Sequence, residues 1–294
     1  YIEKGNLVQD TNFCFYLYQI TMGNHTQTGI MAAVSIEEYN QGLIKKHEFT
    51  RPEKEDDRTR HIDITNANTG PVFLTYRNDG KLKNVILEIL NSHPDISFTA
   101  DDATFHALWK VENKIQIERL IDYFQVIPAL YIADGHHRAA SAARVQKIRE
   151  EANPNHSGYE PYNYFLSVIF PHDEMQILDY NRVVKDLNGF TEEQFHESIN
   201  KNFDIVPIPH PPSPIPENNY SMHINGKWYQ LEAKTHIKSD DPVEGLEASI
   251  LQKYLLTPIL DIDDPRTNKR IDFVGGIRGM VELERRCEID CQVA

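Results

Sequence analysis

One short stretch of the chain combines a carboxylate, a glycine, two imidazoles and a guanidinium: Asp134-Gly135-His136-His137-Arg138. The uncharged apolar residues 129–133 before it predict a buried strand, and the alanine-rich residues from 139 onward predict a helix. The first turn of a helix offers unpaired N–H groups and the positive end of the helix dipole, which together favour anions. Positive charge on two histidines and an arginine is unfavourable at the positive end of a helix unless an anion lies among them. The stretch therefore predicts a phosphate-binding turn. The structural alternative is a turn in which Asp134 only caps the helix.

A second segment, residues 46–58 (KHEFTRPEKEDDR), crowds acidic and basic side chains together. Such charge-rich segments are usually the solvated faces of helices, and Thr50 with Glu53 fits a capping box at the start of a helix over residues 51–64. The functional alternative is an anion site with a general base beside it. Its candidates are Arg51 and Arg58 for the anion, and Glu48 or His47 for the base.

Other metal and phosphate signals in the sequence are weaker. The adjacent pair His136 and His137 lacks the spacing of a zinc site, and His47-Glu48 lacks the second histidine of a zinc-protease motif. The glycine-rich residues 275–279 match no nucleotide-binding fingerprint, which favours a tight packing turn there. Two cysteines four positions apart, with no partner pair, predict buried thiols rather than metal ligands: Cys287 and Cys291.

Composition excludes several classes of function. The net charge of −14 offers no basic excess to neutralise nucleic-acid phosphates, so the sequence predicts no nucleic-acid partner. No apolar run of about 18 residues occurs, which predicts no membrane span. Three cysteines form no disulfide framework, and this favours the reducing cytoplasm. The chain opens on Tyr1 rather than methionine, and we expect it to be truncated at one or both ends.

Strand and helix signals alternate irregularly along the chain, with several hairpins among them. This mixture predicts an α+β protein with mixed sheets and packed helices rather than a regular doubly wound sheet. The clearest loop covers residues 153–158 and predicts a domain boundary. We therefore expect a motif-bearing domain over residues 1–152 and a second α+β domain over residues 159–294.

The two motifs together resemble those of a family of bacterial and archaeal proteins known only as a conserved domain of unknown function. The motifs are residues 46–58 and residues 131–138 (YIADGHHR), and the resemblance runs through nearly all of the chain. The second motif is also similar to the signature of the ParB/sulfiredoxin-like fold, which includes free serine kinases. That resemblance implies that the turn binds nucleotide phosphates, with Asp134 near the metal or the substrate hydroxyl. The residues it assigns to the phosphates are Gly135, His136, His137 and Arg138.

These observations favour phosphoryl transfer from ATP or ADP, with Mg²⁺, to a small hydroxylated metabolite such as serine. Glu48 or Glu53 is the expected base, and Asp134 and His137 are the other expected catalytic groups. Two alternatives stay open: a module that binds a nucleotide or phosphometabolite without turnover, and a phosphate-ester hydrolase. The sequence also leaves open whether the protein forms a homo-oligomer. The kinase hypothesis requires that residues 47–58 fold against residues 134–138.

Overall fold

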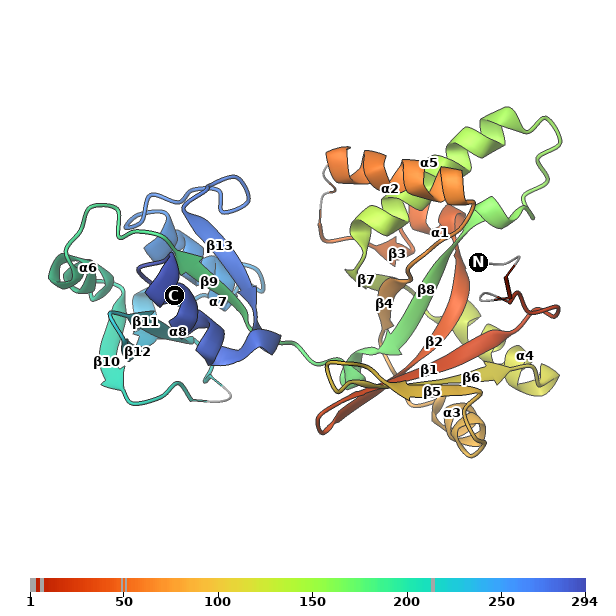
Figure 1. Ribbon diagram of the computed structural model, residues 1–294, viewed down its shortest axis with the longest axis horizontal. Coiled ribbons are helices and arrows are strands. Elements are labelled where there is room, and N and C mark those ends of the chain that lie inside the picture. Colours follow the sequence, from red (N-terminus) through yellow and green to blue (C-terminus); the bar gives the residue numbers. More distant parts are fainter. Residues whose placement is uncertain (1–3, 6–7, 49, 51, 213–214) are drawn as a thin grey trace. The chain divides into compact units, whose positions relative to one another are not determined.

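The computed structural model of the chain describes residues 4–5, 8–48, 50, 52–212 and 215–294 (Figure 1). The chain forms two compact units, Tyr1–Gln176 and Ile177–Ala294. The division lies beyond the loop 153–158 at which the sequence suggests a boundary. The reason is that the strand following this loop pairs with two strands of the first unit.

Among the described residues of the first unit, eight strands form one mixed sheet in the order β3-β7-β4-β8-β2-β1-β6-β5. The pairs β3–β7 and β4–β8 are parallel, and every other neighbouring pair is antiparallel. This mixture of sheet and helix confirms the predicted α+β class. The strands are β1 (Phe15–Met22), β2 (His25–Ser35), β3 (Ile44–Lys45), β4 (Val72–Tyr76), β5 (Ile96–Thr99), β6 (Phe105–Val111), β7 (Leu130–Asp134) and β8 (Tyr164–Pro171).

The helices of this unit lie in two groups. In Figure 1, α1, α2 and α5 lie together at the top, whereas α3 and α4 lie beside β5 and β6. Apolar side chains from the sheet and both groups form the core, among them Leu74, Leu120 and Ala139. The helices are α1 (Ile36–Asn40), α2 (Pro52–Thr65), α3 (Lys83–Leu90), α4 (Lys114–Val126) and α5 (His136–Ala152).

Strand β7 is less buried than its apolar sequence predicts. Ile132 is buried in the core, but Tyr131 is 41% exposed. The reason is the place of β7 near the edge of the sheet. Its only neighbour on the outer side, among the described residues, is β3, which is two residues long. The expectation of a buried strand is therefore correct for Ile132 and wrong for Tyr131.

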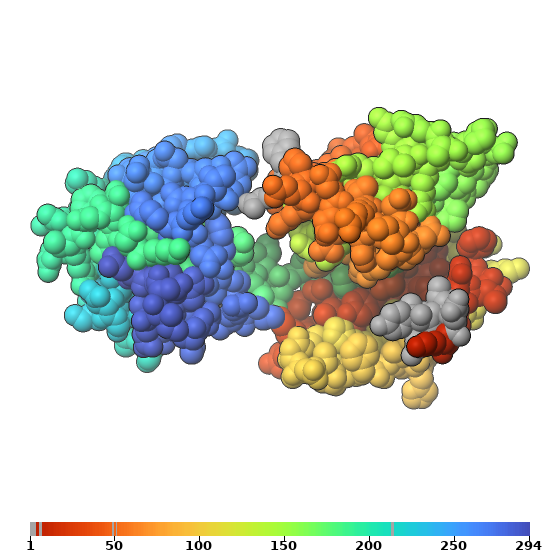
Figure 2. Space-filling model, turned by 45° about the horizontal axis from the view of Figure 1, so that its top comes forward, coloured from red at the N-terminus to blue at the C-terminus, as the bar shows by residue number. Residues whose placement is uncertain are grey.

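Helix α2 has few apolar side chains and is attached to α5 largely through charges. Figure 2 shows α2 in orange beside the green of α5 on the surface of the first unit. Arg144 of α5 lies 3.1 Å from Glu55 and 2.8 Å from Asp56, and Arg149 lies 3.2 Å from Asp63. These ion pairs and the packed face between the helices fix α2, and with it the charged segment, against the helix that follows Gly135.

Thr59 occupies the buried face of α2, and its hydroxyl has no hydrogen-bond partner among the described residues. Because an unpaired buried hydroxyl lowers stability, we expect Thr59→Val to leave the free energy of unfolding unchanged or to raise it by up to about 1 kcal/mol. Thr59→Ser keeps the hydroxyl, loses a buried methyl group and should cost about 1 kcal/mol. Urea unfolding of both variants measures this. A loss of more than about 1 kcal/mol in Thr59→Val would contradict the expectation.

The second unit has a core of its own. Strands β10, β12 and β11 form an antiparallel sheet in that order, and β13 pairs antiparallel with β9. Val293 bridges to both Val184 and Ile224. The elements are β9 (Tyr180–Val184), α6 (Glu192–Ile199), β10 (Phe203–Ile208), β11 (Asn219–Ile224), β12 (Lys227–Ala233), α7 (Glu247–Leu251), a π-helix (Gln252–Leu256), β13 (Ile271–Gly275) and α8 (Gly279–Ile289).

Candidate functional site

Gly135 forms the turn between β7 and α5. Its φ is +97°, a left-handed conformation that glycine adopts without a steric penalty. Gly135 is also the N-cap of the 17-residue α5, and no side chain among the described residues caps this helix. The register between β7 and β4 shifts beside Asp134, as bulges often do where a strand end must be re-aimed. The positive end of α5 is therefore open to an external anion.

A cavity of about 410 Å³ lies at this helix start and brings the two sequence motifs together. Of the predicted site residues, Glu48, Arg58 and all five residues of the turn line it. Arg51 lies outside the described residues. The lining residues are Glu48, Glu53, Lys54, Asp57, Arg58, Asp134, Gly135, His136, His137 and Arg138. The expectation that the two segments fold against each other is thus confirmed, while the roles of the individual residues stay predictions.

His136 connects the turn to the loop before α2. Its side chain is 4% exposed, and its ring lies 4.4 Å from that of His47, edge to face. The backbone N–H of His47 donates to Nε2 at 3.5 Å, and Nδ1 lies 3.5 Å from a carboxylate oxygen of Glu48. Because a backbone N–H can only donate, Nε2 must accept, and the neutral ring carries its proton on Nδ1, facing Glu48. Nδ1 of His136 therefore faces the carboxylate of Glu48 at the edge of the cavity.

Burial of His136, with His47 beside it, lowers the pKa of its imidazole below the ordinary value of 6.5, although the Glu48 carboxylate opposes this. The unfolded chain thus takes up a proton below pH 6.5 that folded His136 does not. The free energy of unfolding should therefore decrease as the pH falls through this range, by at most about 1.4 kcal/mol per pH unit.

His136→Gln keeps an acceptor for the His47 N–H but cannot titrate. We expect its stability to decline less than that of the wild type between about pH 7.5 and about pH 5.5. Trp109 fluorescence in a Trp228→Phe background reports urea unfolding of the first unit, since the chain has two tryptophans. Equal pH slopes in the two proteins would show that His136 is not the titrating group.

Arg138 is held beside the turn by the chain before β4. Its Nη1 donates to the carbonyl of Pro71 at 2.8 Å and lies 3.7 Å from the carboxylate of Asp134. The side chain of Arg138 remains 40% exposed, and that of Asp134 is 74% exposed. One nitrogen of the guanidinium, Nη1, is therefore held by the backbone, while the rest of the group remains accessible to a ligand.

Two residues of the cavity, Lys54 and Asp57, were not singled out by the sequence. The signal was available, because residues 54, 57 and 58 follow the i, i+3, i+4 spacing that places side chains on one face of a helix. Lys54 adds an ammonium beside Arg58, whereas Asp57 adds a carboxylate. The α2 side of the cavity therefore carries both signs of charge.

The family of the chain follows from a match over residues 1–249 to the family described as "Protein of unknown function (DUF1015)". The chain belongs to this family. The match covers the whole first unit and ends within α7, and it confirms the family expected from the two motifs. No curated protein and no solved structure matches the chain. The ParB/sulfiredoxin-like core stays a prediction for this DUF1015 protein.

Among the described residues, no three histidine, cysteine, aspartate or glutamate side chains gather to hold a metal ion. Mg²⁺ with a nucleotide does not need such a group, because it keeps several waters and uses one or two carboxylates together with the phosphates. Asp134, whose side chain is 74% exposed, can supply such an oxygen. The donor set thus fits a Mg-nucleotide. No helix in the described part of the chain is long and apolar enough to span a membrane.

The remaining glycine and cysteine motifs have structural explanations. A Cβ on Gly276 would lie 2.7 Å from the carbonyl oxygen of Asp179, to which the Gly276 N–H donates, so close backbone packing requires glycine there. Burial raises the pKa of the Cys287 thiol to about 12, and Cys291 is buried. These observations agree with the predicted packing turn and with a buried thiol at Cys291, whereas Cys287 is only partly buried.

Proposed function

We propose that the protein transfers a phosphoryl group from a Mg-nucleotide, ATP or ADP, to a small hydroxylated metabolite such as serine. One observation carries this proposal: the start of α5, which no described side chain caps, opens on the same cavity as three cationic and several acidic side chains of the described residues. The cations are Lys54, Arg58 and Arg138. Helix start and cations suit phosphates, and the acids suit a metal ion and a proton transfer.

Each group has a distinct role in this proposal. The N–H groups after Gly135, with His137 and Arg138, bind the phosphates, and His137 is also a candidate catalytic group. Asp134 is the metal ligand, and Mg²⁺ supplies charge neutralisation at the phosphates when bound. Glu48 accepts the proton of the substrate hydroxyl. In this proposal His136 orients Glu48 and does not bind the phosphates, although the sequence predicts a phosphate contact for it.

The exposure of Glu48 supports its role as the base. Its side chain is 60% exposed, so water or a substrate hydroxyl can reach it, and Nδ1 of His136 lies 3.5 Å from one carboxylate oxygen. Phosphoryl transfer requires little covalent chemistry from the protein and depends mainly on positioning and charge. A cavity of about 410 Å³ lies in the range of small-molecule sites.

The direct test incubates the chain with ATP or ADP, Mg²⁺ and serine, and follows both nucleotide and product by ³¹P NMR. Phosphoserine formation would support the proposal. No nucleotide binding at millimolar concentration would overturn it. Binding without product would favour a non-catalytic nucleotide-binding module, and release of inorganic phosphate from phosphoserine would favour a hydrolase.

A further inference from the structure

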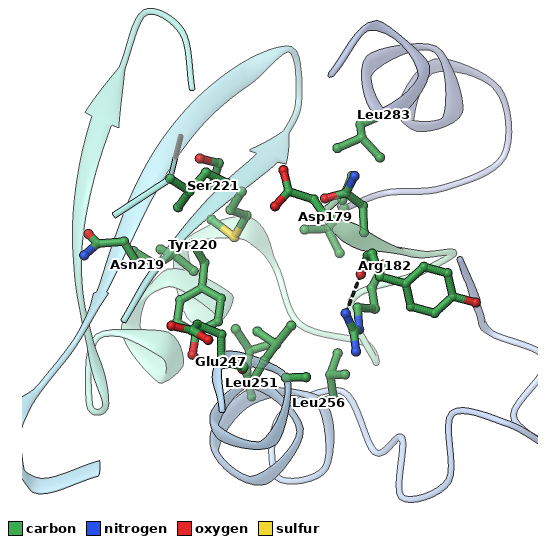
Figure 3. Close-up of a pocket in the computed structure, with 18 of the residues that line it drawn as sticks. Asp179, Arg182, Asn219, Tyr220, Ser221, Glu247, Leu251, Leu256 and Leu283 are labelled. Carbon is green, nitrogen blue, oxygen red and sulfur yellow. Dashed lines mark hydrogen bonds between the residues drawn. The ribbon is translucent and has the colours of Figure 1, made fainter. Parts of the chain in front are cut away.

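A second cavity, of about 550 Å³, lies within the second unit and is walled mainly by apolar side chains. Figure 3 shows Leu251 and Leu256 along one wall of this cavity and Leu283 near another. Asp179 and Arg182 approach from one side, and Tyr220 and Glu247 approach from the opposite side. A mostly apolar cavity with a few converging polar groups is the usual form of a small-molecule site.

Among the described arginines of the second unit, Arg182 differs from the others because it pairs with no carboxylate. The other five arginines of the second unit each lie no farther than 3.7 Å from a carboxylate: Arg266, Arg270, Arg278, Arg285 and Arg286. Within the described chain, Arg182 has no carboxylate at such a distance and donates instead to the carbonyl of Tyr180.

The surroundings of Arg182 are apolar. The guanidinium carbon lies 5.7 Å from the ring centroids of both Tyr180 and Phe273, which stack on each other at 4.9 Å. Burial lowers the pKa of this guanidinium, which is the direction expected of a desolvated cation. A cation in such surroundings binds a carboxylate more strongly than one in water does.

The charges around the cavity limit the ligand further. Among the described residues, the charged groups that line it are the carboxylates of Asp179, Glu217 and Glu247 and the guanidinium of Arg182. A phosphate or another multiply charged anion would therefore meet net repulsion. Glu247 already accepts the backbone N–H of Asn218 at 3.2 Å. Asp179, which is exposed, lies on the same side of the cavity as Arg182, whereas Glu247 lies on the opposite side, so Asp179 is the carboxylate assigned to a ligand cation.

We infer that this cavity binds a small apolar zwitterion, such as an aromatic or branched-chain amino acid. Arg182 pairs with the ligand carboxylate, Asp179 pairs with its ammonium group, and the leucine walls enclose its side chain. The inference concerns residues of the second unit only and does not depend on the phosphoryl transfer proposed for the first.

Isothermal titration of the full chain with L-phenylalanine and L-leucine tests the inference. We expect binding of at least one of them, and weaker binding of 3-phenylpropanoate and 2-phenylethylamine, which each lack one of the two charges. Arg182→Gln should weaken binding about tenfold or more, and Asp179→Asn should weaken it severalfold. Arg278→Gln removes a surface arginine outside the cavity and should leave the affinity unchanged.

Several results would overturn the inference. No binding of either amino acid at millimolar concentration would do so, as would equal binding of 3-phenylpropanoate or unchanged affinity in Arg182→Gln. Circular dichroism checks that each variant is folded. If Arg182→Gln unfolds, Arg182→Lys keeps the charge without the planar fork, and its affinity must still fall below that of the wild type.

Discussion

Replacing Glu48 by glutamine is expected to lower the rate of phosphoryl transfer about 100-fold or more while leaving nucleotide affinity nearly unchanged. Glutamine has almost the same size and still offers a carbonyl oxygen to the Nδ1–H of His136. It cannot accept the proton of the substrate hydroxyl. The effect should therefore fall on kcat rather than on binding.

The position of Glu48 makes this the most sensitive carboxylate of the cavity. Glu53 also lines the cavity, but it lies on α2 and has no contact with His136 among the described residues. Glu53→Gln should consequently reduce turnover less than Glu48→Gln. Glu88→Gln removes a carboxylate paired with Arg119 on the surface, and it controls for the change in net charge.

Phosphoserine formation under saturating nucleotide measures all three variants. If Glu53→Gln abolished turnover and Glu48→Gln did not, the base would be assigned to the wrong residue. If Glu48→Gln weakened nucleotide binding as strongly as turnover, its role would be electrostatic rather than that of a base.

The turn itself could be predicted because its signals are local. Gly135 interrupts an apolar run, and the alanines after it favour a helix, so strand, turn and helix follow from neighbouring residues alone. The structure places β7 and α5 on either side of Gly135 as expected. Local propensity also predicts α2, whose start at Pro52 matches the preference of proline for the first helical turn.

The contact of Glu48 with His136 could not be predicted from the sequence. It depends on β3, a two-residue strand that pairs parallel with β7 through Ile44↔Leu130 and Lys45↔Tyr131. So short a strand leaves no periodic pattern in the sequence, and its pairing is non-local. This pairing brings the loop after Lys45 beside the start of α5.

The cavity of the second unit illustrates the same limit more strongly. Its polar groups come from the start of β9, from β11 and from α7, and no motif unites them. That no described carboxylate pairs with Arg182 is a property of the fold alone. A sequence shows that an arginine is present, but not that its neighbours are two aromatic rings.

Gly135→Ala is expected to lower the free energy of unfolding of the first unit by about 3 kcal/mol. Alanine at φ +97° pays the steric cost of the left-handed region, about 1–2 kcal/mol. Its Cβ would also lie 3.3 Å from the Cα of Val72. Val72 is 1% exposed, and its strand β4 is paired on both sides, so this backbone has little freedom to move away.

Gly158→Ala provides the matched control for this variant. Gly158 also has a positive φ, +90°, but a Cβ there would meet no atom within 4 Å. Gly158→Ala should therefore lower the free energy of unfolding only by the cost of the left-handed backbone conformation, about 1–2 kcal/mol. Urea unfolding followed through Trp109 in the Trp228→Phe background compares the two variants. Equal losses of unfolding free energy would show that the contact between the new Cβ and Val72 does not affect stability.

The same substitution connects stability to the anion site. The new Cβ would lie 3.6 Å from Nη1 of Arg138, the atom that donates to Pro71. Any movement that relieves the contact with Val72 shifts the start of α5 and this guanidinium together. Nucleotide affinity should therefore fall in Gly135→Ala even where the protein remains folded, whereas Gly158→Ala should bind as the wild type does. Unchanged nucleotide affinity in folded Gly135→Ala would show that this turn does not bind the nucleotide phosphates.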